Sequence, residues 1–321
     1  MDAQYRLRLI VDPPREGPWN MAADEWLLHA TSETGGGCLR LYRWEPATLS
    51  LGYFQSAEEL SAHPLGNALP VVRRLSGGGA IVHHHEWTYA LTLPIEHPLA
   101  QDRLALYGGV HRTLVKLLTN LGLSARIFQS QDSQSEGAAC GSLAEGPRER
   151  PDGRGTAPAS SGDRGVGRTR GKCPFLCFLR RSPGDILVKS ADGAFETKIV
   201  GSAQRRERGA VLQHGSILFA QSPFTPELPG LRELCVNGRD GTPAGMKANP
   251  GAGTPQGAPA AELLVHWERD FPGQWVPLLE EGLGCRWEPI DWSRDEVAAI
   301  DGVKSKYEDA AWNRHRRRKT S

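Results

Sequence analysis

Three short apolar runs in the second half of the chain limit its fold more than any other feature. They cover residues 186–189, 195–200 and 211–219, and turns rich in Gly, Asp or Arg bound each of them. Apolar residues that alternate over about four to eight positions are typical of β-strands. Because only short turns separate the runs, we predict three consecutive antiparallel strands, and therefore a sheet built around this segment.

Two residues with complementary chemistry lie at the ends of these strands. Cys177 precedes the first strand and Lys198 lies within the second, so the folded meander brings a thiol and a cation to one cleft. A nearby positive charge stabilises a thiolate, the form of cysteine that attacks thioester carbons. A lone cysteine is more often a small buried apolar residue. Its spacing to Ser182, Asp185 and Lys198 is what favours a nucleophile.

Several motifs in this segment resemble a known enzyme family. They are Cys177-Phe178, Ser182-Pro183 with Asp185, the run KIVGSAQ at 198–204 and the run QHGS at 213–216. Together they are similar to the cysteine-dependent octanoyltransferases of the biotin/lipoate protein ligase superfamily, and the resemblance extends over about 17–313. It implies an α+β fold for 1–321, a single catalytic domain with a mostly antiparallel mixed sheet flanked by helices.

The resemblance also implies a reaction. Cys177 would take an octanoyl group from acyl carrier protein as a thioester and pass it to a lysine of a lipoyl-accepting protein. The acceptor would be the glycine cleavage H protein or a lipoyl domain of a 2-oxoacid dehydrogenase. Lys198 would stabilise the oxyanion of the transition state, and no cofactor is required. We expect a turn at Gly201-Ser202 directly after the Lys198 strand.

A second feature is the run RRLSGGG at 73–79, where glycines let the backbone approach a ligand beside two arginines. Alone, such a run is more often a tight hairpin turn with solvated arginines. Its position resembles the acyl-pocket motif of the superfamily, although Gly79 is a departure toward the ATP-using lipoate ligases. The predicted acyl- and substrate-binding residues are Arg73, Arg74, Ser76, Gly77, Gly78, Gly79, His83, Gly201, Ser202 and His214.

The histidines allow different interpretations. His214 is either a general base for Cys177 or a strand histidine that orders a loop, and only geometry decides between them. His83, His84 and His85 are adjacent, and neighbours in a strand point to opposite faces and bind one metal ion poorly. We predict that His83 lines the pocket, that the other two lie at the surface, and that the chain has no metal site.

Composition excludes several classes of protein. The chain has 321 residues, 39% hydrophobic and 23% charged, with a net charge of +1. So small a charge provides no field for nucleic acid or a membrane surface, and no apolar run approaches the roughly 18 residues that span a bilayer. The N-terminus lacks the apolar core of a signal peptide. We therefore expect a cytoplasmic monomer with reduced cysteines.

Other segments have clear local patterns. Asn20 is expected to cap a first helix, residues 104–121 to form a long amphipathic helix, and Ser293 with Glu296 to open a last helix as a capping box. Residues 130–172 contain almost no large apolar side chain, so we expect a disordered insert. Residues 237–261 are rich in Gly, Pro and Ala, which is typical of a flexible surface loop.

Three other functions stay open. An amidotransferase that moves octanoyl between lipoyl proteins differs only in its donor. An ATP-dependent lipoate-protein ligase is favoured by Gly79 and disfavoured by Cys177, because adenylation needs no nucleophilic thiol. The third is a non-catalytic carrier-protein-binding module that uses the basic tail at 314–319.

Overall fold

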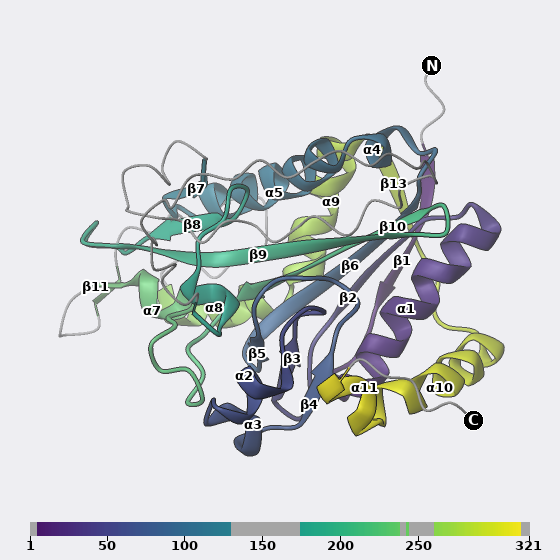
Figure 1. Ribbon diagram of the computed structural model, residues 1–321. Helices are drawn as coiled ribbons and strands as arrows, with labels where there is room; N and C mark the ends of the chain where they lie inside the picture. The colour runs from purple at the N-terminus through teal and green to yellow at the C-terminus, as the bar shows by residue number, and fades with distance from the viewer. Residues whose placement is uncertain (1–4, 130–173, 238–241, 244–259, 316–321) are drawn as a thin grey trace, which may run out of the picture.

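A mixed eight-stranded β-sheet forms the centre of the structure (Figure 1), a computed structural model that describes residues 5–129, 174–237, 242–243 and 260–315. Its strand order is β13-β1-β2-β6-β10-β9-β8-β7. β1 pairs in parallel with β13 and with β2, and every other neighbouring pair in this sheet is antiparallel. The α+β fold with a mostly antiparallel mixed sheet is confirmed. The strands are β1 Tyr5–Val11, β2 Cys38–Tyr42, β6 Glu86–Pro94, β7 Ala125–Ile127, β8 Ile186–Lys189, β9 Glu196–Glu207, β10 Ala210–Leu218 and β13 Cys285–Pro289.

Helices cover both faces of this sheet, and the alternation of the strands decides which residues meet them. On β6, Tyr89 and Leu91 belong to the core shared with α5 (Arg103–Asn120) and α9 (Phe271–Leu283). Ala90, between them, belongs to the core shared with α1 (Gly17–Thr34) and α10 (Arg294–Glu308). Figure 1 shows the two helix pairs on separate sides of the long strands.

A small three-stranded sheet lies beside the large one and positions the cysteine segment. β3 (Thr48–Leu51) runs between β4 (Val71–Arg73) and β5 (Ile81–His83). Its apolar core also includes Leu176, the residue before Cys177. Because Ala80 and Leu176 form a β-bridge, the backbone before the cysteine is attached to the start of β5. The short helices around this sheet are α2 Ala57–Ser61, α3 Leu65–Ala68 and α11 Ala310–His315.

The remaining elements are short. β11 (Val236–Asn237) pairs with β12 (Thr242–Pro243), and α8 begins at Ala260, so the ends of 237–261 belong to these elements where the structure describes them. The insert predicted at 130–172 lies outside the described residues. No helix in the part of the chain that the structure describes has the length and hydropathy needed to cross a bilayer. The other helices are α4 Pro98–Gln101, α7 Leu231–Cys235 and α8 Ala260–Arg269.

Two local predictions are wrong. β9 continues to Glu207, and Gly201 and Ser202 pair with Ser216 and Gly215 of β10, so no turn follows Lys198. The first helix begins at Gly17, with a proline in its first turn, and Asn20 lies inside it. The Asn20 side chain donates to the Arg15 and Arg43 carbonyls instead of capping the helix.

Other local predictions hold. β8 has the predicted bounds, and β10 differs from its predicted run by one residue at each end. The long amphipathic helix is α5, which begins one residue before its predicted start. Ser293 opens α10 with the full capping box that its spacing to Glu296 predicts.

Candidate active site

Cys177 is held against the glycine loop by two backbone hydrogen bonds. The Cys177 amide donates to the Ala80 carbonyl at 2.7 Å, and the Ala80 amide donates to the Phe175 carbonyl at 2.9 Å. A Cβ on Gly79 would lie 2.9 Å from the Cys177 nitrogen, closer than Cβ atoms approach such a neighbour in folded proteins. Gly79 is therefore required for the contact between the loop and the cysteine, a local reason for the third glycine that involves no nucleotide.

The ammonium of Lys198 lies beside the Cys177 sulfur. Nζ is 3.6 Å from Sγ, 3.4 Å from the Cys177 carbonyl oxygen and 2.8 Å from a carboxylate oxygen of Asp185. Burial alone would lower the pKa of Lys198, but the Cys177 sulfur and the Asp185 carboxylate together raise it above its usual value. The lysine therefore stays a cation although only 4% of it is exposed.

A β-bulge and a glycine direct Lys198 toward the cysteine. Ile186 of β8 pairs with Val200, and Leu187 pairs with Lys198, so Ile199 is an extra residue in β9. A Cβ on Gly201 would lie 2.6 Å from Cε of Lys198. The lysine side chain thus occupies the space that a side chain at position 201 would fill, which explains the glycine within a strand.

Cys177 lines a cavity of about 430 Å³, a volume that includes the open mouth of the cavity. The structure places most of the predicted binding residues in its wall. Ser76 and Gly79 lie behind the wall, where they support His214 and Cys177. Across the ranges that the structure describes, no group of three His, Cys, Asp or Glu side chains could hold a metal ion. The predicted residues in the wall are Arg74, Gly77, Gly78, His83, Cys177, Gly201, Ser202 and His214.

The two neighbouring arginines have different surroundings. Arg74 lines the cavity, and its guanidinium donates to the carbonyls of Gly77 and Gly79, which fixes the loop. Burial lowers the pKa of Arg74 to about 10, while the Cys177 sulfur opposes that change. Arg73 is fully buried away from the cavity and donates to carbonyls that include those of Gly52 and Asn313. Arg73 therefore supports the cavity wall without lining it.

His83 lines the cavity as expected, and its contacts fix the orientation of its ring. It stacks on Trp44 with 3.8 Å between the ring centroids. Nδ1 donates to Glu86 at 2.5 Å, and Nε2 accepts from Ser50 at 2.7 Å. Arg74 donates to the same Ser50 hydroxyl, so these contacts connect His83 to the glycine loop.

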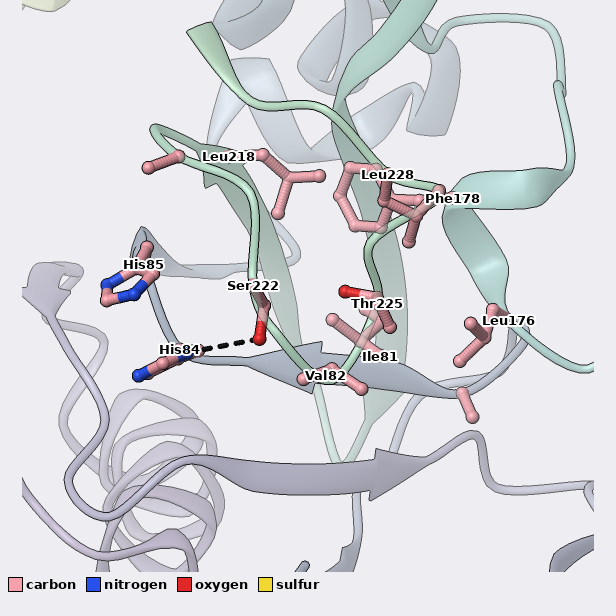
Figure 2. Close-up of a pocket in the computed structure, with 12 residues that line it drawn as sticks. Ile81, Val82, His84, His85, Leu176, Phe178, Leu218, Ser222, Thr225 and Leu228 are labelled. Carbon is pink, nitrogen blue, oxygen red and sulfur yellow. Dashed lines mark hydrogen bonds between the residues drawn. The ribbon is translucent and has the colours of Figure 1, made fainter. Parts of the chain in front are cut away.

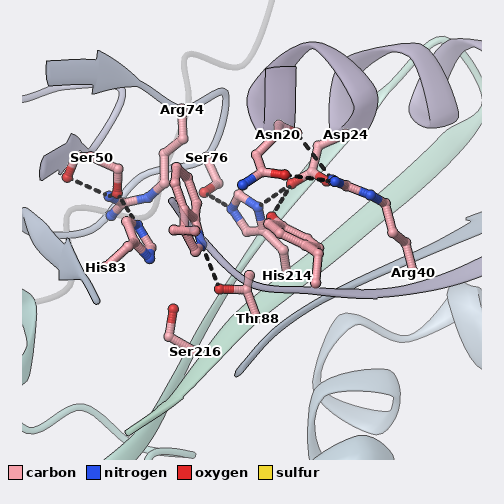
Figure 3. A network of polar contacts seen from close by, with 12 residues as sticks. Asn20, Asp24, Arg40, Ser50, Arg74, Ser76, His83, Thr88, His214 and Ser216 are labelled. Atoms are coloured by element: carbon pink, nitrogen blue, oxygen red, sulfur yellow. Dashed lines mark hydrogen bonds and ion pairs between the residues drawn. The ribbon is translucent and has the colours of Figure 1, made fainter. Parts of the chain in front are cut away.

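His214 contacts a carboxylate and a serine in the opposite part of the wall (Figure 3). Nδ1 donates to Asp24 of α1 at 3.1 Å, and the Ser76 hydroxyl donates to Nε2. Asp24 in turn accepts from Arg40 at 3.0 Å and from Tyr42 at 2.9 Å. Neither ring nitrogen bonds the Cys177 sulfur, so this geometry does not support His214 as the base of that thiol.

A second buried histidine contacts Ser202. Nδ1 of His111 donates to the Gly184 carbonyl at 2.6 Å, and the Ser202 hydroxyl donates to Nε2 at 2.7 Å. Tyr89 donates to the same hydroxyl at 2.7 Å. Burial, with a smaller contribution from the Lys198 charge, lowers the pKa of His111 to about 4. His111 is therefore neutral and supports the wall at Ser202.

A second, smaller cavity shares Ile81 with the first (Figure 2). Leu176 and Phe178, on either side of Cys177, both line it. His84 also lines it and hydrogen-bonds Ser222 at 3.1 Å, whereas His85 is the exposed member of the stacked pair. Cys177 therefore lies between two cavities, and His84 is half-buried rather than fully at the surface.

Sequence reasoning missed Asp24 and His111. Asp24 and Asn20 are four residues apart on a helix, both fully buried, and both bond Arg40. Two polar residues with i, i+4 spacing inside an apolar helix face were the available signal. His111 occupies a comparable position on the buried face of α5.

Comparison with known proteins shows the family of the chain. The lipoyl protein ligase A/B catalytic domain matches residues 16–225. The octanoyltransferase LipM of Kyrpidia tusciae is 30% identical over 319 residues, which cover 95% of this chain and 97% of that protein. The LipM of Brevibacillus brevis is 34% identical over 216 residues, 66% of this chain and 65% of that protein.

Solved structures agree in fold. Ta0514, a putative lipoate protein ligase from T. acidophilum, superposes with a TM-score of 0.59 at 17% identity, covering 96% of this chain and 98% of its own. The same protein with bound lipoic acid gives a TM-score of 0.57 at 18% identity, covering 97% and 98%. The chain therefore belongs to the lipoyl protein ligase A/B catalytic domain family, in its octanoyltransferase branch, and is an acyltransferase.

Proposed function

We propose that this chain moves an octanoyl group from acyl carrier protein to a lysine of a lipoyl-accepting protein through a thioester on Cys177. The observation that carries the proposal is the 3.6 Å contact between the Lys198 ammonium and the sulfur of Cys177, a residue that lines the cavity. A buried ammonium beside a sulfur favours the thiolate, which is the attacking form. The names of the LipM relatives support the octanoyl group.

In the first half-reaction the Cys177 thiolate attacks the carbonyl carbon of the donor thioester. Lys198 then donates to the oxygen that becomes negative in the transition state, and Asp185 holds the ammonium in place at 2.8 Å. The donor thiol leaves, and the acyl group remains on the sulfur. The two cavities beside Cys177 offer separate places for the acyl chain and for the arriving or leaving arm of the carrier.

In the second half-reaction an acceptor lysine attacks the acyl-enzyme, and the product is an amide. The energy of the thioester drives this step, so neither ATP nor another cofactor takes part. The proposed acceptors are the glycine cleavage H protein and the lipoyl domains of 2-oxoacid dehydrogenases. We propose that the residues of the cavity wall predicted from the sequence bind the acyl group, and that Arg73 supports them from outside the wall.

Intact-mass spectrometry tests the proposal. The protein is incubated with octanoyl carrier protein, with and without ATP, and then with a lipoyl domain. We expect one octanoyl mass on a peptide that contains Cys177, labile to hydroxylamine, followed by transfer to the domain without ATP. An octanoyl lipoyl protein that replaces the carrier as the preferred donor would indicate an amidotransferase. A requirement for ATP and free acid would indicate a ligase, and no adduct and no transfer would overturn the proposal.

A further inference from the structure

A hydrogen-bonded network of side chains runs from Arg40 through Asp24 and His214 to Ser76. It does not activate the cysteine, because both ring nitrogens of His214 bond other groups. We propose that His214, oriented by Asp24, accepts the proton that the attacking amine loses when the acyl group leaves Cys177. This inference rests on the proposed function and assigns a proton acceptor to its second half-reaction. Figure 3 shows the side chains of this network in one line.

The tautomer of His214 follows from its partners. A carboxylate only accepts, so the proton of the neutral ring is on Nδ1, which donates to Asp24 at 3.1 Å. Nε2 therefore carries the lone pair, and the Ser76 hydroxyl donates to it. The wall thus presents an imidazole whose Nε2 lone pair is on the side of the glycine loop. A histidine with a carboxylate behind it is the usual arrangement of a general base.

The charges behind His214 can accommodate an imidazolium. Arg40 is fully buried and bonds two carboxylates, Asp12 at 2.6 Å and Asp24 at 3.0 Å. One cation between two anions leaves one negative charge in excess, and Asp24 is the anion that contacts the ring. When the ring accepts a proton, that excess charge is neutralised within the buried cluster. A histidine placed only to order the loop would not need this excess negative charge.

His214 can be reached from the cavity in which the acyl group is held on Cys177. It lines the same cavity as Cys177, together with Gly77 and Gly78 of the loop that Ser76 precedes. His111, which accepts from Ser202 in the same wall, is not an alternative proton acceptor. A carbonyl instead of a carboxylate lies behind its Nδ1, and its pKa of about 4 keeps it neutral.

His83 lines the same wall and also has an acid, Glu86, behind its ring. That ring is stacked on Trp44, however, and its Ser50 partner is bound by Arg74. His214 is therefore the proposed acceptor.

The step balances without a further reactant. The neutral amine attacks the acyl carbon, a C–N bond forms, and the nitrogen carries a positive charge while the oxygen carries a negative one. One N–H proton passes to Nε2 of His214, directly or through the Ser76 hydroxyl. The C–S bond then breaks, its electron pair returns to the Cys177 sulfur, and Lys198 stabilises the thiolate. In the next acylation the imidazolium proton goes to the sulfur of the departing donor thiol.

The test compares two nucleophiles on the isolated octanoyl-enzyme. n-Butylamine has the basicity of a lysine side chain, and its adduct needs a proton acceptor. Hydroxylamine is weakly basic, and its nitrogen loses the proton to water without help. The rate of loss of the octanoyl mass is measured with each in the parent, His214→Asn and Asp24→Asn. We expect His214→Asn to slow the butylamine reaction by about 100-fold and the hydroxylamine reaction far less.

The matched control is His111→Asn, which changes a buried histidine that also accepts from a serine in this wall. A structural defect slows both nucleophiles alike, so the ratio of the two rates should stay at the parent value in His111→Asn and fall in His214→Asn. His83→Asn should also leave the ratio of the two rates at the parent value. Asp24→Asn should lower the ratio to a smaller extent. If His214→Asn fails to fold, His214→Gln serves for the same ratio. An unchanged ratio in a folded His214 variant overturns the inference alone, whereas a parent that forms no adduct overturns the proposed function as well.

Discussion

Two parts of the site each place a basic side chain in front of a buried carboxylate, and they differ in what the base can do. On β9, Lys198 contacts Asp185 and the Cys177 sulfur. On β10, His214 contacts Asp24 and a serine. The raised pKa of Lys198 keeps its charge constant through the reaction, whereas His214 has a ring nitrogen that can accept a proton. The first arrangement suits the stabilisation of negative charge, and the second suits the movement of a proton.

The difference shows why one cavity needs both arrangements. Thiolate and oxyanion stabilisation require a fixed positive charge close to the sulfur, and the bulge at Ile199 brings Lys198 there. Amine deprotonation requires a nitrogen with a lone pair, and the Asp24 and Ser76 contacts place the lone pair of the His214 ring on Nε2. The first arrangement is tested below through Cys177, Lys198 and Gly201, and the neutral state of the second buried histidine, His111, through the pH dependence of stability.

The largest effect is expected from Cys177→Ala, because no other described cysteine lines the cavity. The octanoyl adduct and the transfer should both be lost, as measured by intact mass and by acylation of a lipoyl domain. Cys235→Ala is the control, since burial raises the pKa of that thiol to about 12 and keeps it inert. Transfer at the parent rate by Cys177→Ala would remove the thioester from the mechanism.

Lys198→Ala should slow acylation of Cys177 by about 100-fold, the scale seen when one oxyanion donor is removed. Lys198→Arg should not restore the rate, because Cε already lies against the backbone at Gly201, where a longer planar group does not fit. The measurement is rapid-quench acylation by octanoyl carrier protein. Lys189→Ala, at an exposed position of β8, should leave the rate unchanged. A Lys198→Ala protein as fast as the parent would exclude the ammonium from the chemistry.

His111 should make stability depend on pH. Its pKa is about 4 when folded and 6.5 in its ordinary state, so between these values the unfolded chain binds the proton more readily. The contribution of His111 to the free energy of unfolding is therefore full above pH 6.5 and falls as the pH drops toward 4. Between pH 7.5 and 5 the loss from this group is about 2 kcal/mol. Urea unfolding of the parent and of His111→Asn at both pH values measures it, and equal losses in the two proteins would contradict the assignment.

The smallest effect is expected from Gly201→Ala, which keeps every polar group of the site. The new Cβ would lie 2.6 Å from Cε of Lys198, so the ammonium must move from the sulfur, and acylation should slow by about tenfold. The same rapid-quench measurement applies. Gly302→Ala in α10 is the control, because a Cβ there meets no atom within 4 Å. Acylation at the parent rate in Gly201→Ala would show that the site tolerates a displaced lysine.

Much of the fold and part of the site can be predicted from local sequence. Alternating apolar residues locate β8 and β10, and the capping box at Ser293 locates the start of α10. Such patterns succeed because strand alternation and helix capping depend on neighbours a few residues apart. The prediction of a turn at Gly201 is wrong because the glycine makes room for the Lys198 side chain. A glycine alone does not distinguish a turn from a position where another group packs closely against the backbone.

The sequence by itself determined the nucleophile candidate, the lysine candidate and the glycine loop, because each is a continuous motif. Only the tertiary structure decided which neighbours act together. Arg73 and Arg74 are adjacent and identical, yet α11 buries the first and the cavity receives the second. Asp24 and Ser76 lie 190 and 138 residues before His214, whose ring joins them. Their contact exists because α1 packs on the face of β10, and long-range packing of this kind leaves no local pattern in the chain.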